Sequence, residues 1–164
     1  MSKETFNVLF LCTANSARSI MAECALRHRG EGRLNAFSAG SHPSGKVHPV
    51  ALELMRKMGF ETGDLRSKSW DEFSGPGAPV MDFVFTVCGN AAGETCPVWP
   101  GHPATAHWGV EDPAAFDGPP EVMEGHFRRA YAILDKRVRA FAGLPFGTLD
   151  RQFLQQRLAG IGEL

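Results

Sequence analysis

The feature that most constrains the fold is an apolar run, Phe6–Leu11, that leads directly into the segment Cys12-Thr-Ala-Asn-Ser-Ala-Arg-Ser19. The run contains β-branched and aromatic residues and no charge, which is typical of a strand buried on both faces, as in a parallel sheet. Beyond the segment, apolar residues recur at helical spacing until Gly30, a typical helix end. The first thirty residues therefore predict a strand, a loop and a helix in that order.

The rest of the chain continues this alternation. The patterns predict strands over 35–40, 80–87 and 105–108, a helix between Pro49 and Gly59, a loop over 61–79 with a short helix near Trp70, a helix over 121–141, and a last helix over 149–158 with Thr148 as its N-cap. Strands that alternate with helices predict an α/β fold around a small parallel sheet, with right-handed connections.

The size and charge of the chain narrow the class of protein. Its 164 residues favour a single domain over 1–164, and its formal net charge of −1 gives no general attraction for nucleic acid or anionic membranes. No apolar stretch reaches 18 residues and no signal peptide is recognisable, so we expect a cytoplasmic protein without a membrane span. In a reducing compartment the four cysteines are then expected to be buried or working thiols rather than structural disulfides.

Three segments each follow a predicted strand, so they should meet at the edge of the sheet formed by the carboxyl ends of the strands. Ligands of open α/β sheets bind at this edge. The three segments are residues 12–19, 88–97 and 108–113. In the first, Cys12 and Arg18 are separated by five residues at the entry to a helix, where backbone N–H groups favour an anion. This field should lower the pKa of Cys12 and make it a nucleophile, while Arg18 grips two oxygens of a tetrahedral oxyanion. Asn15 should fix the shape of the loop, and Ser19 could donate to the thiolate.

Several motifs together resemble the arsenate reductases of the low-molecular-weight tyrosine phosphatase superfamily. They are Cys12 to Ser19 followed by Met21-Ala-Glu23, then Ser38-Ala-Gly40, Cys88, Cys96-Pro97, His107-Trp-Gly109 and Asp112-Pro113. The resemblance covers about residues 6–142. It implies a three-layer αβα fold with a central four-stranded parallel sheet, to which residues 143–164 add a C-terminal helical extension. It also implies reduction of arsenate to arsenite with electrons from a cellular thiol system.

The resemblance assigns roles by position. Cys12 would be the nucleophile, Arg18 the oxyanion clamp, Asp112 the general acid, and Cys88 and Cys96 the two resolving cysteines. The substrate would be bound by the whole loop: Thr13, Ala14, Asn15, Ser16, Ala17, Arg18 and Ser19. No cofactor or metal is expected, although some relatives hold potassium near the positions of Asn15, Glu23, Ser38 and Asp64. Ala17 stands where the family often has a further cysteine.

A reductase and a phosphatase share the first step, in which a thiolate attacks and an acid protonates the departing oxygen. Reduction then needs a second thiol. Cys88 is predicted at the end of a strand beside Cys12, and Gly89 to Thr95 contains two glycines and only small or polar residues, which suits a loop that brings Cys88 to Cys12 and then to Cys96. Thioredoxin, or glutathione with glutaredoxin, would be the electron donor to a monomeric enzyme, and phosphate or sulfate would compete with arsenate.

Two other functions are considered. The chain could be a low-molecular-weight tyrosine phosphatase that hydrolyses phosphate monoesters, but Ala114-Ala115 follows Asp112-Pro113 where those relatives place tyrosines. Alternatively, Cys88, Cys96, His102 and His107 could bind zinc, although this spacing is not one of the usual compact ligand patterns and leaves residues 12–19 unexplained. Cys24, on the apolar face of the first helix, is predicted to be a core residue.

Overall fold

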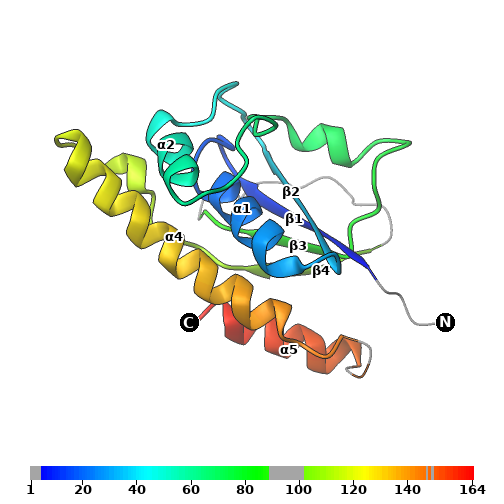
Figure 1. Cartoon of the computed structure of the whole chain (residues 1–164). Helices are drawn as coiled ribbons and strands as arrows, with labels where there is room; N and C mark the ends of the chain where they lie inside the picture. Colours follow the sequence, from blue (N-terminus) through cyan, green and yellow to red (C-terminus); the bar gives the residue numbers. More distant parts are fainter. Residues whose placement is uncertain (1–4, 89–101, 147, 149) are drawn as a thin grey trace.

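The computed structural model describes residues 5–88, 102–146, 148 and 150–164, and it contains a four-stranded parallel sheet (Figure 1). The strands are β1 (Phe6–Cys12), β2 (Leu34–Gly40), β3 (Phe83–Thr86) and β4 (Ala104–His107), and their order across the sheet is β2-β1-β3-β4. In the register, Val8 of β1 lies between Ala36 of β2 and Phe83 of β3. The parallel sheet expected from the alternating pattern is confirmed.

The helices occupy the segments between the strands and after them. They are α1 (Arg18–Gly30), α2 (Pro49–Lys57), the short 3-10 helices η1 (Trp70–Phe73) and η2 (Pro113–Ala115), α4 (Pro120–Ala142) and α5 (Arg151–Ile161). Pro49 occupies the first turn of α2, where its missing N–H costs nothing, and Gly59 follows that helix with a φ of 89°. Both ends of α2 therefore lie where the sequence predicted them.

Helices cover both faces of the sheet. The larger core lies under α1 and α4 and contains Phe10, Phe85 and Phe127, whereas a smaller core on the opposite face joins Leu9 and Leu11 to Phe73 of η1. Alternate residues of β1 thus enter opposite cores, as the two-residue period of a strand requires. Each such fully buried side chain contributes about 1.5–3 kcal/mol of apolar burial. An apolar β1 without alternation is the direct result of this double burial.

The C-terminal helix α5 lies beside β4 at the edge of the sheet (Figure 1). Gln155 Nε2 donates to the carbonyl oxygen of Thr105 at 2.5 Å, and the indole N–H of Trp108 donates to the carbonyl oxygen of Leu158 at 2.9 Å. The predicted C-terminal helix is confirmed, and it covers the edge strand, whose unpaired backbone groups would otherwise be open to another chain.

Several boundaries differ from the prediction, two of them by more than one residue at the start of an element. The third strand begins at Phe83 and not at residue 80, and just before it the Asp82 carboxylate accepts from the backbone N–H of Asn7 at 2.7 Å. The last helix begins at Arg151 because the Asp150 carboxylate caps it, accepting from the N–H of Phe153 at 2.7 Å. Thr148 is therefore not the cap; its hydroxyl donates to the carbonyl oxygen of Pro145.

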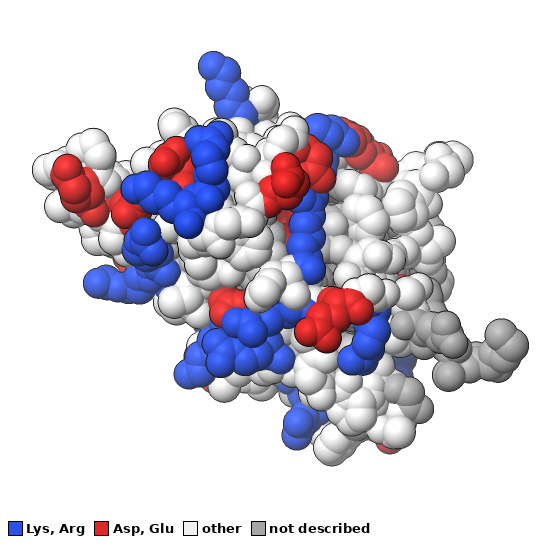
Figure 2. All heavy atoms as spheres, in the orientation of Figure 1, with Lys and Arg blue, Asp and Glu red and all other residues white. Residues whose placement is uncertain are grey.

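Charges of both signs alternate on the face of the molecule shown in Figure 2. Several form pairs between or along helices, including Arg29 with Asp135 at 2.9 Å and Lys57 with Glu124 at 2.7 Å. No helix in the described part of the chain is long and apolar enough to cross a membrane.

Candidate active site

The topology places the predicted site at a break in the strand order. The chain passes from β1 to β2 on one side and then returns to β3 on the other side of β1. In open α/β sheets, ligands bind where the order reverses, beyond the carboxyl ends of the strands. Cys12 is the last residue of β1, and Cys88 comes two residues after β3, so both thiols lie at this point.

The loop between β1 and α1 has the geometry of an anion cradle. Its carbonyl groups point outward to neighbouring segments: Thr13 accepts from the N–H of His42 at 2.9 Å, Ala14 from Ser44 at 3.0 Å, and Ser16 from His48 at 2.8 Å. The amides of residues 14–17, in contrast, have no hydrogen-bond partner among the residues that the structure describes. With the N-terminus of α1 beside them, these N–H groups suit a bound oxyanion.

Asn15 holds the loop in shape, as predicted from the sequence. It has a φ of 48°, in the left-handed region that asparagine tolerates, and it is fully buried. Its side-chain amide donates to the hydroxyls of Ser19 at 2.8 Å and Ser38 at 3.0 Å, and its Oδ1 accepts from the N–H of Lys68 at 2.9 Å. One side chain thus ties together three segments of the chain around the cradle.

Gly40 allows this loop to approach β2 closely. A Cβ atom at residue 40 would lie 2.5 Å from the carbonyl oxygen of Thr13 and 3.0 Å from the Cβ of Asn15. Both contacts are with the loop itself, which has no free space to move into. Gly40 is therefore required by packing at the end of β2, which gives a physical reason for the glycine of the Ser38-Ala-Gly40 motif.

Cys12 and Cys88 lie together at the entrance to the cradle. Their thiols are hydrogen-bonded to each other, and the backbone N–H of Thr13 donates to Cys88 Sγ at 3.2 Å. The Thr13 hydroxyl lies 3.4 Å from the same sulfur. Cys88 therefore lies against Cys12, and it also contacts the loop that forms the cradle.

The pKa of Cys12 differs from the expectation. The interaction with Cys88, in which Cys12 keeps its proton, and then burial raise the pKa of the Cys12 thiol above its ordinary value, and the charge of Arg18 opposes this rise only in part. The prediction of a lowered pKa was wrong for this arrangement, because sequence reasoning counted the helix N-terminus and Arg18 but not a second sulfur in contact. Activation of Cys12 requires that contact to change.

Arg18 connects the cradle to the predicted acid segment. Its Nη1 donates to the carbonyl oxygen of Val110 at 2.9 Å, and its Nη2 lies 3.6 Å from a carboxylate oxygen of Asp112. Its Nε is buried and has no partner among the described residues. Arg18 thus has a donor available for an oxyanion, and Asp112, at the start of η2, faces the same site.

His48 was not predicted as a site residue but lies next to the cradle. Its backbone N–H donates to Ser16, its Nδ1 accepts from the N–H of Val50 as the cap of α2, and its ring packs on Phe127 with centroids 4.8 Å apart. Burial lowers the pKa of His48, and the nearby charge of Asp112 opposes this. The only local signal was its place before Pro49, which indicates a helix cap and no chemistry.

A cluster of buried polar side chains lies next to Asn15 of the cradle, and Lys68 supplies a positive charge to it. Glu23 accepts from the Ser38 hydroxyl at 2.5 Å and pairs with Arg27, while the ammonium of Lys68 lies 3.4 Å from the Ser38 hydroxyl and 3.9 Å from Glu23. Asp64 is paired with Arg27 at 3.0 Å. Lys68 was missed because its position gives no sequence signal; folding brings it to residues 30 and 45 positions away.

The remaining predicted residues are placed as follows. Cys24 is fully buried in the larger core, as predicted, and burial raises its pKa to about 12. Cys96 lies outside the described residues. His107 Nδ1 shares a hydrogen bond with the Thr86 hydroxyl at 2.7 Å, and no group of three or more His, Cys, Asp or Glu side chains within the described ranges is arranged to hold a metal.

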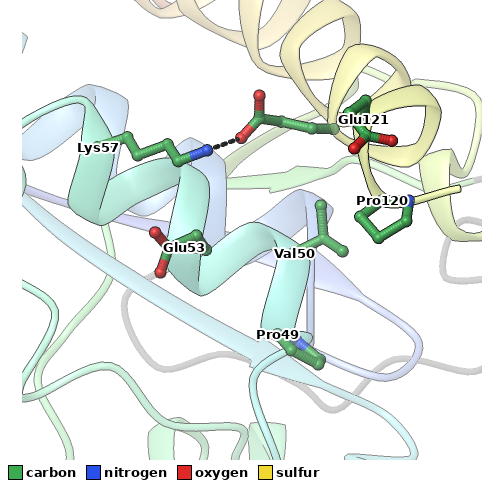
Figure 3. Close-up of a pocket in the computed structure, with 7 residues that line it drawn as sticks. Pro49, Val50, Glu53, Lys57, Pro120 and Glu121 are labelled. Atoms are coloured by element: carbon green, nitrogen blue, oxygen red, sulfur yellow. Dashed lines mark hydrogen bonds and ion pairs between the residues drawn. The ribbon is translucent and has the colours of Figure 1, made fainter.

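A separate surface cavity of about 330 Å³ lies between α2 and α4 (Figure 3). Val50, Glu53 and Lys57 on α2 and Pro120 and Glu121 on α4 line it, and the ion pair from Lys57 to Glu124 joins the two helices (Figure 3). None of the predicted site residues lines this cavity. The predicted oxyanion site is therefore separate from this cavity.

Comparisons with known proteins agree with this geometry. The sequence model of the family described as low molecular weight phosphotyrosine protein phosphatase matches residues 7–156. An arsenate reductase of Bacillus licheniformis is 38% identical over 87% of this chain and 97% of its own length. The crystal structure of an arsenate reductase from Archaeoglobus fulgidus superposes with a TM-score of 0.66 at 28% identity, over 84% of this chain and 99% of that one. A thioredoxin-dependent arsenate reductase of Corynebacterium glutamicum gives a TM-score of 0.53 at 27% identity, over 81% and 62%.

Proposed function

Because the chain belongs to the low-molecular-weight phosphotyrosine protein phosphatase family, we propose that its anion cradle serves arsenate reduction, with Cys12 as nucleophile and Cys88 as the first resolving thiol. The observation that carries the proposal is the contact between the two thiols at the cradle. Hydrolysis of a phosphoenzyme needs water at that point, whereas reduction needs a second sulfur. The names of the relatives support the same choice.

The first step forms a bond between sulfur and arsenic. The Cys12 thiolate attacks dihydrogen arsenate, an oxygen departs as water with a proton from Asp112, and monothiol arsenate remains on Cys12 while Asp112 becomes a carboxylate. The loop amides and Arg18 hold the oxygens of arsenate, for which Arg18 exchanges its contact with Val110. The pairing of Arg18 with Asp112 supports the acid role, since it brings the proton donor to the substrate.

The second step transfers two electrons. The Cys88 thiolate attacks Cys12 Sγ, the bond between sulfur and arsenic breaks, and its electron pair leaves with arsenic as arsenite, which takes up protons from solvent. A disulfide between Cys12 and Cys88 results. Formation of this bond requires Cα atoms within about 7 Å, and the contact between the thiols supports that approach. The Thr13 contacts with Cys88 Sγ would stabilise its thiolate.

The third step returns Cys12 to its reduced state. Cys96 attacks Cys88, releases the Cys12 thiolate and leaves a disulfide between Cys88 and Cys96, which an external dithiol then reduces. We propose thioredoxin as that donor, because this chain carries all three thiols, with glutathione and glutaredoxin as the alternative. We also propose a cytoplasmic monomer that acts as one domain over 1–164 with 143–164 as its helical extension, and that phosphate and sulfate compete for the cradle.

Phosphomonoester hydrolysis is the second candidate, since it uses the same cradle and the same acid. The sole tyrosine, Tyr131, is buried on α4, where Phe60 packs against it. It is therefore unavailable as an aromatic wall for phosphotyrosine. We expect at most weak hydrolysis of aryl phosphates.

The proposal is tested by arsenate-dependent NADPH oxidation, coupled once to thioredoxin and its reductase and once to glutathione, glutaredoxin and glutathione reductase. Turnover with either system is expected for the native chain, and the faster system identifies the donor. Cys12→Ser should abolish it, whereas Cys24→Ser should retain it. No turnover with both systems beside rapid hydrolysis of an aryl phosphate would refute the reductase and leave the phosphatase.

The thiol relay has its own test. After one equivalent of arsenate without external reductant, peptide mapping should find a disulfide between Cys88 and Cys96, and the Cys96→Ser variant should accumulate the bond between Cys12 and Cys88. Loss of turnover in Cys88→Ser with no oxidation of Cys96 in the native chain would contradict the relay.

A further inference from the structure

Arg137 is a buried cation whose hydrogen bonds go to backbone oxygens and not to acidic side chains. It lies on α4 with 7% of its surface exposed, and no acidic side chain pairs with it among the described residues. Its Nη1 donates to the carbonyl oxygens of Trp108 at 2.8 Å and Gly109 at 3.0 Å, and its Nη2 donates to the backbone oxygen of Leu164 at 3.2 Å. Burial of an unpaired guanidinium is costly and lowers its pKa, so its position is fixed by these few acceptors.

The C-terminal strap, residues 158–164, contacts His107 and Trp108. Leu158 accepts from the indole of Trp108, which is fully buried and stacked on Phe85 with ring centroids 3.8 Å apart. Gly162 packs so closely that a Cβ atom there would lie 2.6 Å from the carbonyl oxygen of His107 and 3.0 Å from Trp108 Cδ1. Trp108 is thus contacted both by Arg137 and by the strap, and Arg137 also binds Leu164 of the strap itself.

The next residues of the chain belong to the active site. Val110 donates to the carbonyl oxygen of Val87 at 3.0 Å and accepts from Arg18 at 2.9 Å, and Asp112 follows two residues later. Val110 follows Gly109 directly, and Asp112 lies three residues after Gly109. A displacement at Gly109 would therefore shift both the Val110 carbonyl that binds Arg18 and the Asp112 carboxylate that faces Arg18. The segment has no helix or strand of its own between β4 and η2, so its place depends on these contacts.

From this arrangement we propose that Arg137 is a positioning residue for the acid segment and that the C-terminal strap, which Arg137 joins to Trp108 and Gly109, sets where Asp112 meets the substrate. The proposal rests on the acid role of Asp112 given above. It assigns a task to residues beyond the long α4 helix. Arg137 and Gly162 act through Asp112 and touch no reacting atom.

The test compares two glycines of the full-length chain. Gly162→Ala would push the strap away from His107 and Trp108, whereas Gly160→Ala is the matched control, since a Cβ atom at residue 160 meets nothing within 4 Å. Single-turnover formation of the bond between Cys12 and arsenic should slow by about tenfold in Gly162→Ala and by less than about twofold in Gly160→Ala. Sulfate affinity should change by less than about threefold in both, because the loop amides remain.

A double-variant cycle separates positioning from general loosening of the fold. If Gly162 acts through Asp112, Gly162→Ala should slow the single-turnover rate by less than about twofold when Asp112→Asn is already present. An equal loss in both backgrounds would overturn the proposal. An unchanged rate in Asp112→Asn alone would instead refute the acid role itself, whereas a slow Asp112→Asn beside a native rate in Gly162→Ala would refute positioning by the strap alone.

The positioning role of Arg137 is tested by one substitution that keeps its positive charge and one that removes it. Arg137→Lys keeps a cation at the backbone oxygens and should recover most of the rate that Arg137→Met loses, and both losses should vanish in the Asp112→Asn background. Arg139→Met is the control, since Arg139 lies on the same helix but is exposed. A native rate in a folded Arg137→Met would overturn its role; if that variant does not fold, the Arg137→Lys rate and its dependence on Asp112 decide.

Discussion

The protonation state of Cys12 depends on the groups that contact its sulfur. Arg18 and the Thr13 amide favour the thiolate, but the Cys88 thiol and burial outweigh them, so the pKa of Cys12 is raised in this arrangement. The sulfur that opposes ionisation of the nucleophile is also the one proposed to attack it later. We therefore expect Cys12 to ionise more readily once its contact with Cys88 is exchanged.

Removal of that sulfur should activate the nucleophile. In Cys88→Ala the pKa of Cys12 should fall, because its largest raising contribution is lost, and alkylation of Cys12 by iodoacetamide should occur at lower pH than in the native chain. The measurement is the pH dependence of Cys12 labelling by mass spectrometry. Cys24→Ala is the control and should leave the profile unchanged; a Cys88→Ala profile shifted to higher pH would contradict this account.

At the scale of elements, the cradle is built by contacts between β1, β2 and the segment before η1. The loop after β1 touches Gly40 at the end of β2, and Asn15 accepts from the backbone of Lys68. No single element could hold a loop whose amides are all turned inward. The shape of the cradle is thus a property of three segments packed together.

Although Gly40→Ala adds only one methyl group, it should therefore distort the cradle strongly. The added methyl group meets the Thr13 carbonyl at a distance that atoms do not tolerate, and such overpacking costs about 1–3 kcal/mol. We expect a lower thermal midpoint together with at least tenfold weaker sulfate binding. Gly63→Ala, where a Cβ atom meets nothing within 4 Å, should change neither.

The start of α5 gives a second prediction at this scale. Asp150→Ala removes the oxygen that accepts from the N–H of Phe153 and should cost about 1 kcal/mol of unfolding free energy, measured by urea denaturation. Thr148→Ala is the control and should cost clearly less, because the Thr148 hydroxyl bonds only to Pro145 and caps no helix. Equal losses would mean that the helix begins where the sequence pattern placed it.

On the scale of the whole molecule, selectivity for an anion cannot come from the overall charge. The net charge is −1, and both signs are interspersed on the face that Figure 2 shows. The affinity must come from the inward amides and Arg18, which act over a few ångströms. Such a site is hardly affected by a screening length of about 10 Å.

This predicts a weak dependence of arsenate capture on ionic strength. Between 50 and 200 mM sodium chloride, on the order of a typical assay range, kcat/KM for arsenate should change by less than about twofold. Sodium sulfate at the same ionic strength should inhibit much more, since sulfate occupies the cradle itself. A steep fall with chloride would indicate steering by a charged surface instead.

The sequence by itself determined the features that contiguous residues encode. The doubly buried β1, the loop that follows it, the helix α1, the proline start of α2 and the parallel α/β alternation all follow from local pattern. The expectation that Cys12 and Cys88 lie at one edge followed from their places after two parallel strands. Helix and strand periods repeat within a few residues, so they are readable without knowledge of the fold.

Only the tertiary structure decided how the site is tuned. The raised pKa of Cys12 depends on a sulfur 76 positions away, the support of the cradle on Lys68, and the place of Asp112 on Arg137 and the C-terminal strap. Electrostatic effects depend on distance and burial, and packing contacts depend on which surfaces meet; neither quantity is a function of sequence spacing.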